Sequence, residues 1–293
     1  MLAVFLAFAL ALPHSPRIQD PAMETVAGPE APPFEWVEGP GEGPLGERAR
    51  VTVPLGFSFT GAKGAQAVLE AMENPTSGNE LGLLAYDSDV AGQSWFVVFE
   101  FSESGYVKDE DRDELESDAL MATMKEGNEH GNELRKQRGW EAIELVGWKR
   151  EPFYDPRTNN LTWATLARSA SGGESVNWSV RVLGRQGVMN IDLVLGPELL
   201  DAALPEFEKV IDSFQYEDGQ RYAQFTAGDK IAEYGLAALV VGGGAAIAAK
   251  TGLFAKLFKF AVPILLAIGA FGKRIWGWFT GRSRTEARDG ESS

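Results

Sequence analysis

The sequence predicts an α+β fold, in which helices cover a largely antiparallel sheet, followed by C-terminal transmembrane helical segments. Three observations predict this arrangement. Apolar and polar residues alternate along residues 51–59 and 177–183, as in half-buried strands. Apolar residues recur at helical spacing along residues 205–214, which indicates a helix with one buried face. An almost uncharged apolar stretch begins near residue 231.

The first 47 residues are expected to precede the folded domain. Residues 1–12 form an apolar run with a small-x-small pattern, and they are too short to span a bilayer, which needs about 20 residues. This run predicts a secretory signal peptide. Residues 13–47 hold eight of the fifteen prolines and few large apolar side chains, so we expect a disordered leader there. The α+β domain is expected over residues 48–230.

Within the domain, the expected elements run from a strand to a closing helix. The strand at 51–59 contains Pro54, which cannot donate a ladder hydrogen bond, so we expect it at a sheet edge. Residues 94–101 are apolar on both faces, which predicts a central strand. The other expected strands are 81–86, 141–153, 161–170, 176–185 and 187–196, and the expected helices are 61–74, 111–125, 128–138 and 205–214.

Two strands near the end of the domain are expected to form an antiparallel hairpin. Gly184 and Gly187 bracket a tight turn between residues 177–183 and 188–195. The residues expected in the core are Val51, Val53, Phe57, Phe99, Trp178, Val180, Ile191, Phe207 and Ile211.

Composition excludes several classes of function. The 293 residues include 27 Lys and Arg against 42 Asp and Glu, and a net charge of -15 repels nucleic acid. The chain has no cysteine, which excludes disulfides, thiol catalysis and zinc-thiolate sites. It has two histidines, which excludes a multi-histidine metal site. No cofactor is expected.

The apolar C-terminal stretch has two incompatible interpretations. Residues 244–251, GAAIAAKT, differ at one position from the phosphate-binding pattern G-x-x-x-x-G-K-[ST]. Ala249 replaces the last glycine, and no strand carrying an aspartate follows, so nucleotide binding is not expected. The favoured interpretation is a membrane anchor over residues 231–280, with apolar segments at 231–249 and 253–272, followed by a polar tail at 281–293. The alternative is a buried helical hairpin in a soluble core.

The anchor interpretation predicts partners and a location. Aromatic residues stand beside cations after residue 272, as at a bilayer interface. Ala238, Gly242 and Ala246 recur every four residues, and such small residues let a second copy or another membrane protein approach closely. The expected partners are therefore the lipid bilayer and a membrane helix. The domain is expected on the periplasmic side of the inner membrane. A two-crossing hairpin is favoured over a single crossing with an interfacial helix.

Five stretches together resemble one family, and they are GYVKDEDRDEL (105–115), GNELRKQRGW (131–140), GWKREPFYDPRTNNLTWA (147–164), NWSVRVLGRQGVMNIDL (177–193) and GQRYAQFTAGDKIAEYGLAALVVGG (219–243). They resemble the bacterial predicted membrane-anchored proteins known as domain of unknown function 2167, over roughly residues 48–260. The resemblance implies a signal peptide, an exported domain and a C-terminal anchor, and it implies no activity. The apolar first strand and the closing helix ending Ile-Asp-Ser-Phe are weakly similar to PsbP-like domains.

Five polar residues are candidates for an anion-binding face, and they are Asn132, Arg135, Asn177, Arg181 and Arg185. The strand pattern places Asn177 and Arg181 on the same face. Ion pairs with the many carboxylates of the chain are the alternative interpretation.

Three aspartates, Asp109, Asp111 and Asp113, have the spacing of the first ligands of a calcium loop. The sixth position is Glu114 where the sharp turn needs glycine, and the twelfth is Leu120 where the loop needs a bidentate glutamate. We therefore favour the interpretation that these acids begin a helix, where they interact well with the helix dipole.

The sequence predicts a membrane-anchored envelope protein that acts as a non-enzymatic binding or assembly module. It contains no cluster that pairs a nucleophile with a base or that would hold a metal. The alternative is an envelope hydrolase that uses Asp109, Asp111 or Asp155 together with His130. A third possibility is a channel or assembly factor built by oligomerisation through the small-residue stripe.

Overall fold

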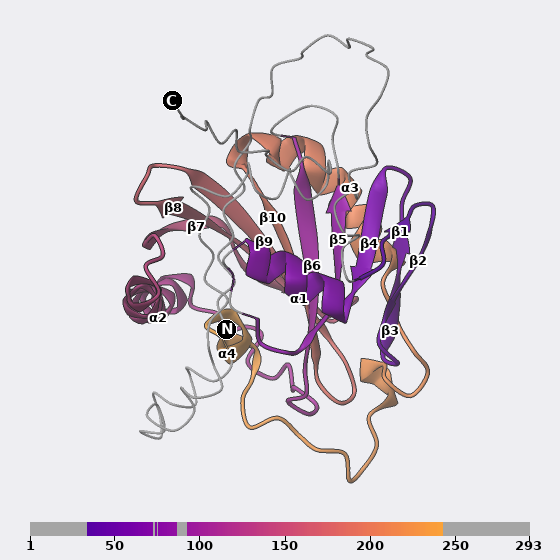
Figure 1. Ribbon diagram of the computed structural model, residues 1–293. Coiled ribbons are helices and arrows are strands. Elements are labelled where there is room, and N and C mark those ends of the chain that lie inside the picture. The colour runs from indigo at the N-terminus through magenta and orange to yellow at the C-terminus, as the bar shows by residue number, and fades with distance from the viewer. Residues whose placement is uncertain (1–33, 73, 75, 87–92, 243–293) are drawn as a thin grey trace, which may run out of the picture.

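The computed structural model describes residues 34–72, 74, 76–86 and 93–242 (Figure 1). Its centre is an eight-stranded sheet, and each neighbouring pair of strands is antiparallel. The spatial order is β1 (Val37–Glu38), β4 (Phe57–Gly61), β5 (Glu80–Tyr86), β6 (Trp95–Ser102), β10 (Val188–Leu195), β9 (Glu174–Leu183), β8 (Asn160–Ser169) and β7 (Ile143–Asp155). The predicted antiparallel α+β class is confirmed. The predicted hairpin is also confirmed, as β9 and β10, and β6 is central as expected.

A small sheet and one helix cover the first face of the central sheet. The small sheet has the order β11 (Gln215–Tyr216), β3 (Ala49–Val53) and β2 (Gly41–Leu45), and the helix α3 (Leu200–Ser213) follows the short 3-10 turn η1 (Pro197–Leu199). The main apolar core lies between these layers. Eight of the nine predicted core residues are buried in it, and Ile211 packs partly buried against it.

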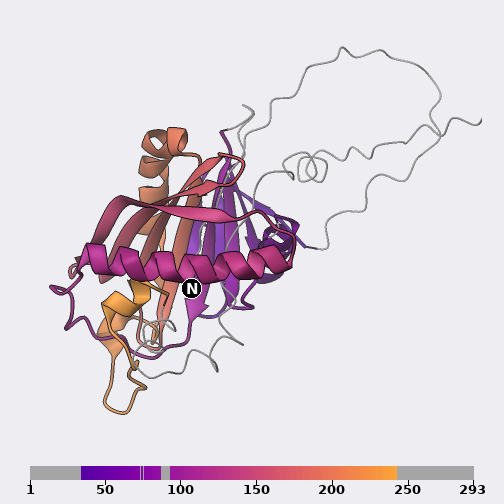
Figure 2. The same cartoon turned by 90° about the vertical axis from the view of Figure 1, so that its left-hand side faces the viewer.

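Three helices lie against the second face. α1 (Ala62–Ala71) packs on β4 and β5, and α2 (Ser117–Gln137) packs on β7. Figure 2 shows that α2 runs across the strands of the sheet. α4 (Leu236–Val240) shares an apolar cluster with α2, whereas α1 builds a separate cluster. The second face therefore carries two apolar clusters.

A row of polar side chains crosses the second face between these clusters. Glu80, Glu100, Asn190 and Arg181 are cross-strand partners on β5, β6, β10 and β9. Period-2 alternation places them on the face opposite the main core. Three of these four residues are buried, and Asn190 is partly buried. We call these four residues the polar row.

The prediction of a single edge strand over residues 51–59 is wrong. The chain forms β3 and β4 in two different sheets, with a turn between them in which the Phe57 N–H donates to the Pro54 carbonyl. Gly56 has a φ of +83°, a conformation that favours glycine, and Leu55 is 80% exposed. This turn divides the alternating residues 51–59 between the end of β3 and the start of β4.

The predicted disordered leader extends too far, because residues 37–45 form β1 and β2. β2 pairs with β3 along its whole length, and Leu45 is completely buried. A Cβ at Gly43 or Gly82 would lie within 2.7 Å of the Phe59 ring, so this ring packs directly on the backbone of both glycines. Backbone pairing with β3 and the contact of the Phe59 ring with Gly43 therefore hold β2 in place, although β2 has few large apolar residues of its own.

α2 continues through Gly127, where the sequence predicts a break. A Cβ at Gly127 would meet open space. The opposite face of the helix packs on the sheet, where Leu120 and Met124 share an apolar cluster with residues of β7 and β8. Tertiary packing therefore offsets the low helix propensity of glycine.

The described part of the predicted anchor, residues 231–242, packs against the domain. The transmembrane helical segment predicted over residues 231–249 is not a continuous helix in its described part, because α4 covers only Leu236–Val240 and Gly242 has a φ of +97°. Ala238 is buried, so it does not form an open stripe with Gly242, and Ala246 lies outside the described residues, as do segments 243–249 and 253–272. Within the described ranges, no helix is long and apolar enough to cross a membrane.

Candidate functional site

Residues 217–235 run from β11 to α4, and we call them the C-terminal strap. The strap pairs with the β2–β3 turn, where the Glu217 N–H donates to the Arg48 carbonyl at 2.8 Å. It then meets the β9–β10 turn through a bridge between Gly184 and Arg221, and the Arg185 N–H donates to the Gln220 carbonyl at 2.9 Å. The strap therefore adds backbone pairing at two turns that are far apart in the sequence.

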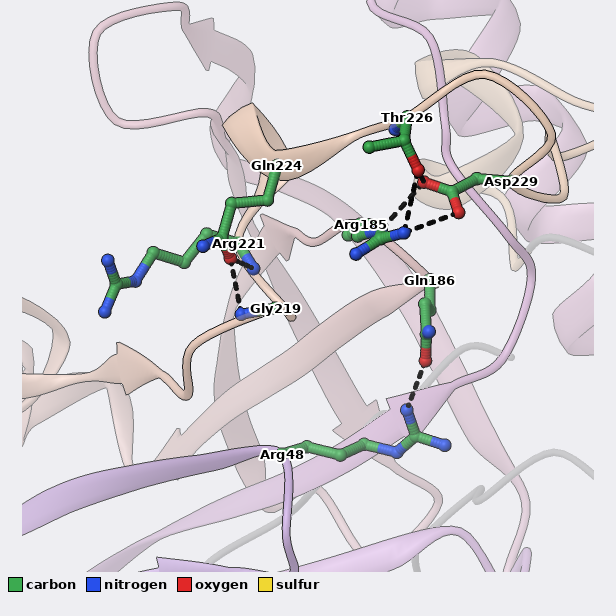
Figure 3. A network of polar contacts seen from close by, with 8 residues as sticks. All are labelled: Arg48, Arg185, Gln186, Gly219, Arg221, Gln224, Thr226 and Asp229. Atoms are coloured by element: carbon green, nitrogen blue, oxygen red, sulfur yellow. Dashed lines mark hydrogen bonds and ion pairs between the residues drawn. The ribbon is translucent and has the colours of Figure 1, made fainter.

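An ion pair fixes the strap to the β9–β10 turn (Figure 3). The Arg185 guanidinium donates from Nε and Nη2 to the two carboxylate oxygens of Asp229, at 2.7 and 2.8 Å. Nη2 also donates to the Thr226 hydroxyl at 2.8 Å. These bonds to Arg185, followed by the Thr226 N–H, hold the pKa of Asp229 well below its usual range. The bidentate geometry sets both the position and the orientation of the strap.

A glutamine closes the first half of the strap. The Gln224 side-chain carbonyl accepts the N–H groups of Gly219 and Arg221, at 2.8 and 3.0 Å (Figure 3). Its amide donates to Asp218 at 2.7 Å. One side chain thus satisfies the backbone donors that the turn into the 3-10 helix η2 (Tyr222–Gln224) leaves without helical partners.

Aromatic stacking fixes the middle of the strap to the segment after β6. Tyr106 and Tyr222 stack with ring centroids 4.4 Å apart, and Phe225 lies 4.3 Å from Tyr106 on centroids. The Tyr222 hydroxyl donates to the Val107 carbonyl at 3.0 Å, and burial raises the pKa of Tyr222. Tyr222 therefore acts here as a neutral donor.

The end of the strap pairs with the same segment through backbone groups. The Tyr106 N–H donates to the Lys230 carbonyl at 2.7 Å, and the Ala232 N–H donates to the Tyr106 carbonyl at 2.9 Å. Gly105 has a φ of +92°, and a Cβ there would lie 2.6 Å from the Lys230 oxygen. Only glycine allows this approach without strain.

Asp111, in the segment that follows β6, binds the start of α4. Its two carboxylate oxygens accept the N–H groups of Leu236 and Ala237, at 3.0 and 3.2 Å. A Cβ at Gly235 would lie 2.5 Å from Asp111 Oδ2, so a larger residue there would displace this carboxylate. The favoured interpretation of the three aspartates as helix-start acids is wrong, because α2 begins at Ser117 and Asp111 caps a different helix.

The other acids proposed for calcium binding or hydrolysis have separate neighbours. Asp109 pairs with Arg112 at 3.4 Å, and Asp113 approaches Arg112 at 3.9 Å. Asp155 accepts the Arg157 N–H, which lowers the pKa of Asp155. His130 lies exposed on α2. Among the described residues, no three His, Cys, Asp or Glu side chains are grouped as a metal site would need.

Two of the five anion-site candidates lie together on β9. Asn177 and Arg181 are buried on the second face of the sheet, as the alternation predicts. Arg181 forms an ion pair with Asp192 at 3.0 Å, and its guanidinium lies 4.7 Å from the centroid of Trp163. The Ser179 hydroxyl donates to the same Asp192 oxygen at 2.6 Å.

The remaining three candidates lie elsewhere. Asn132 exchanges hydrogen bonds with the backbone of Ile143, at 2.7 and 2.9 Å, and Arg135 donates to the Glu141 carbonyl. Both residues therefore hold α2 on the chain where it enters β7. Arg185 belongs to the contacts of the strap. The five residues occupy three places with different neighbours, and they do not form one anion-binding face.

Sequence reasoning missed Asp229, Tyr106, Tyr222 and the glutamates of the polar row. Glu80 and Glu100 carried a detectable signal, since each is an acid beside a strongly apolar run. A charged residue in a buried strand indicates a functional or paired group. No comparable local signal identified Asp229.

Comparison with known proteins identifies the family. The family model described as a protein of unknown function, DUF2167, matches residues 37–272. The chain belongs to this family. The match starts at the first residue of β1, ahead of the start predicted at residue 48. No curated protein matches the chain.

A solved structure similar to the chain is the solution structure of cyanobacterial PsbP (CyanoP) from Synechocystis sp. PCC 6803. The identity is 14%, the similarity covers 67% of this chain and 99% of that chain, and the TM-score is 0.35. No activity follows from this similarity.

Proposed function

We propose that the chain is a non-enzymatic binding or assembly module of the cell envelope, tethered to a membrane by the residues that follow α4. The observation that carries the proposal is the docking of the C-terminal strap. Residues 217–235 are held by paired backbone groups, the Arg185–Asp229 ion pair and the Tyr106–Tyr222 stack. The strap leads directly into the apolar residues that the sequence assigns to an anchor.

A docked strap suits a tethered module better than a free linker would. A flexible linker leaves the orientation of a domain undefined relative to the membrane. Here, the strap leads into α4, whose residues Leu236 and Val240 are buried in the same apolar cluster as residues of α2 and β10. In this proposal the domain keeps a defined orientation on the periplasmic side of the membrane and presents one surface to a partner.

The arrangement of acids favours a binding role over hydrolysis. A hydrolase needs its acid and base within hydrogen-bond reach of one reacting group. Asp111 is used to cap α4, and Asp155 is bound to the Arg157 backbone. These contacts occupy both carboxylates in local structural roles.

The test is fractionation of cells that express the full chain, followed by a wash of the membranes at alkaline pH. We expect the full chain to stay with the washed membranes and to be digested by protease added to spheroplasts. The matched control ends after residue 242, which keeps α4 and the strap, and it should leave the membranes. Recovery of the full chain in the soluble fraction would refute the tether, and protection from protease would refute the periplasmic side.

A further inference from the structure

Two buried glutamates lie directly opposite each other on the second face of the sheet. Glu80 on β5 is the cross-strand partner of Glu100 on β6, and they are 1% and 7% exposed. Two neighbouring carboxylates with so little access to water do not both ionise without a large cost in free energy. One of the two is therefore expected to hold a proton.

The hydrogen bonds show which carboxyl group is the anion. Glu80 accepts the N–H groups of Ser77 and Gly78 at 2.6 and 2.9 Å, the Ser77 hydroxyl at 3.0 Å, and the Gln66 amide at 3.2 Å. An ionised carboxylate has about four acceptor positions. Four donors occupy those of Glu80, so the surroundings of Glu80 favour its charged form.

The Ser77 hydroxyl then requires a proton on Glu100. Ser77 Oγ lies 3.0 Å from Glu80 Oε1 and also 3.0 Å from Glu100 Oε1. A hydroxyl has one hydrogen and two lone pairs. It accepts the Asn79 N–H with one lone pair and donates to Glu80, so its contact with Glu100 needs a hydrogen supplied by Glu100.

The charges around Glu100 favour the same assignment. Burial, followed by the negative charge of Glu80, raises the pKa of Glu100 to about 7. Among the described residues, Asp192 on β10 adds a further negative charge on this face, and Arg181 on β9 is already paired with Asp192. α1 faces Glu80 with Gln66, which carries no charge.

The proton on Glu100 keeps residues 76–79 and α1 in place. Residues 76–79 immediately precede β5, and the Asn79 carbonyl accepts the Phe101 N–H at 3.0 Å. On α1, the Gln66 amide donates to the Glu80 carboxylate. If Glu100 ionises, Ser77 Oγ can donate to only one of the two carboxylates, and the other contact becomes a repulsive one.

We propose that Glu80, Ser77 and Glu100 form a proton-operated latch, which holds residues 76–79 and α1 on the sheet while Glu100 is protonated and loosens them when it ionises. The latch is separate from the proposed membrane attachment, because the side-chain hydrogen bonds of its three residues go to α1, residues 77–79 and each other, and none of these reaches the strap or α4. It would make the α1 side of the domain respond to pH between mildly acidic and neutral conditions.

The direction of the response follows from proton linkage. In the opened state Glu100 would titrate near its ordinary pKa of 4.5, and in the closed state near 7. The closed state is therefore fully favoured below about pH 4.5. Opening should increase by about tenfold for each pH unit between these values and level off above about pH 7.

The experiment is hydrogen exchange by mass spectrometry on the full chain in detergent, from pH 5 to pH 8.5, with labelling times scaled to the intrinsic amide rate. In the natural protein, protection of the Ser77, Gly78 and Asn79 amides should fall by more than about tenfold between pH 5 and pH 7. In Glu100→Gln, a neutral amide donates to Ser77 at every pH, so protection should stay constant. Glu42→Gln is the matched control, since this exposed acid lies on β2, and it should keep the pH response.

Constant protection of the natural protein across this range would overturn the latch, and so would an unchanged pH response in Glu100→Gln. Ser77→Ala provides a second variant if Glu100→Gln does not fold. It keeps both carboxyl groups but removes the shared hydroxyl, so protection should already be low at pH 5. Protection at pH 5 equal to that of the natural protein would also overturn the proposal.

Discussion

The C-terminal strap and the Glu80–Ser77–Glu100 latch both depend on carboxylates, and they differ in what those carboxylates contact. In the strap, Asp229 has a guanidinium as its partner. In the latch, Glu100 faces a second carboxylate through one hydroxyl. The first arrangement favours the ionised form and the second favours the protonated form.

This difference gives the two regions opposite dependences on pH. The pKa of Asp229 is lowered, so its contribution to stability is present above the ordinary value of 3.8 and is lost as the pH falls further. The pKa of Glu100 is raised, so its contribution is present below 4.5 and is lost as the pH rises toward 7. One fold therefore contains an attachment that weakens in acid and another that weakens near neutrality.

The largest effect is expected from Arg181→Ala. This change removes the cation that pairs with Asp192 on the second face of the sheet, where the latch also lies. Asp192 would keep the Ser179 hydroxyl but lose its cation while only 5% exposed. Breaking a buried ion pair in this way typically costs about 3–5 kcal/mol of unfolding free energy. Urea denaturation followed by tryptophan fluorescence measures this loss.

Arg157→Ala is the control for Arg181→Ala, because the Arg157 side chain is 83% exposed and pairs only at the surface. Its effect should stay within about 0.5 kcal/mol. A loss below about 1 kcal/mol for Arg181→Ala would mean that Asp192 finds another partner, and the polar row would then not depend on this ion pair.

A smaller effect is expected from Asp111→Ala, which tests the contact between the segment after β6 and the start of α4. Loss of a helix cap costs about 0.5–2 kcal/mol. Asparagine has one side-chain acceptor oxygen, so Asp111→Asn should keep one of the two hydrogen bonds to α4 and lose less stability than Asp111→Ala. Asp113→Ala, at a side chain that is 93% exposed, should change little. Equal losses for Asp111→Ala and Asp111→Asn would show that one acceptor oxygen is not enough to cap α4.

The smallest change in overall stability is expected from Asp229→Asn, whose effect should be confined to the strap. At neutral pH, hydrogen exchange of residues 219–235 should become faster while exchange in β9 and β10 stays slow. In the natural protein, the strap should loosen as the pH falls below 3.8, and the variant should lack this acid dependence. An acid response that persists in Asp229→Asn would assign it to another group.

The hairpin of β9 and β10 was predictable because period-2 alternation is a local pattern. Trp178, Val180 and Ile191 lie in the main core as that pattern requires. β2 was not predictable in the same way, because its residues are held by pairing with β3 and by the Phe59 ring on Gly43. Hydrophobicity along the chain does not register contacts of this kind.

The candidate site shows the same limit at the level of single residues. Alternation placed Asn177 and Arg181 on one face correctly. It could not separate them from Arg185, which lies just beyond Leu183, the last residue of β9, where the chain turns and meets the strap. Where a strand ends, its alternation no longer predicts the direction of a side chain.

The sequence by itself determined the fold class, eight residues of the main core and the lack of cysteine chemistry, because these depend on composition and on short repeats. Only the tertiary structure decided the role of each acid. Asp111 meets the start of α4 across 125 residues of sequence, and Asp229 meets Arg185 across 44. A carboxylate's charge and role depend on its neighbours and its burial, and the path of the chain sets both.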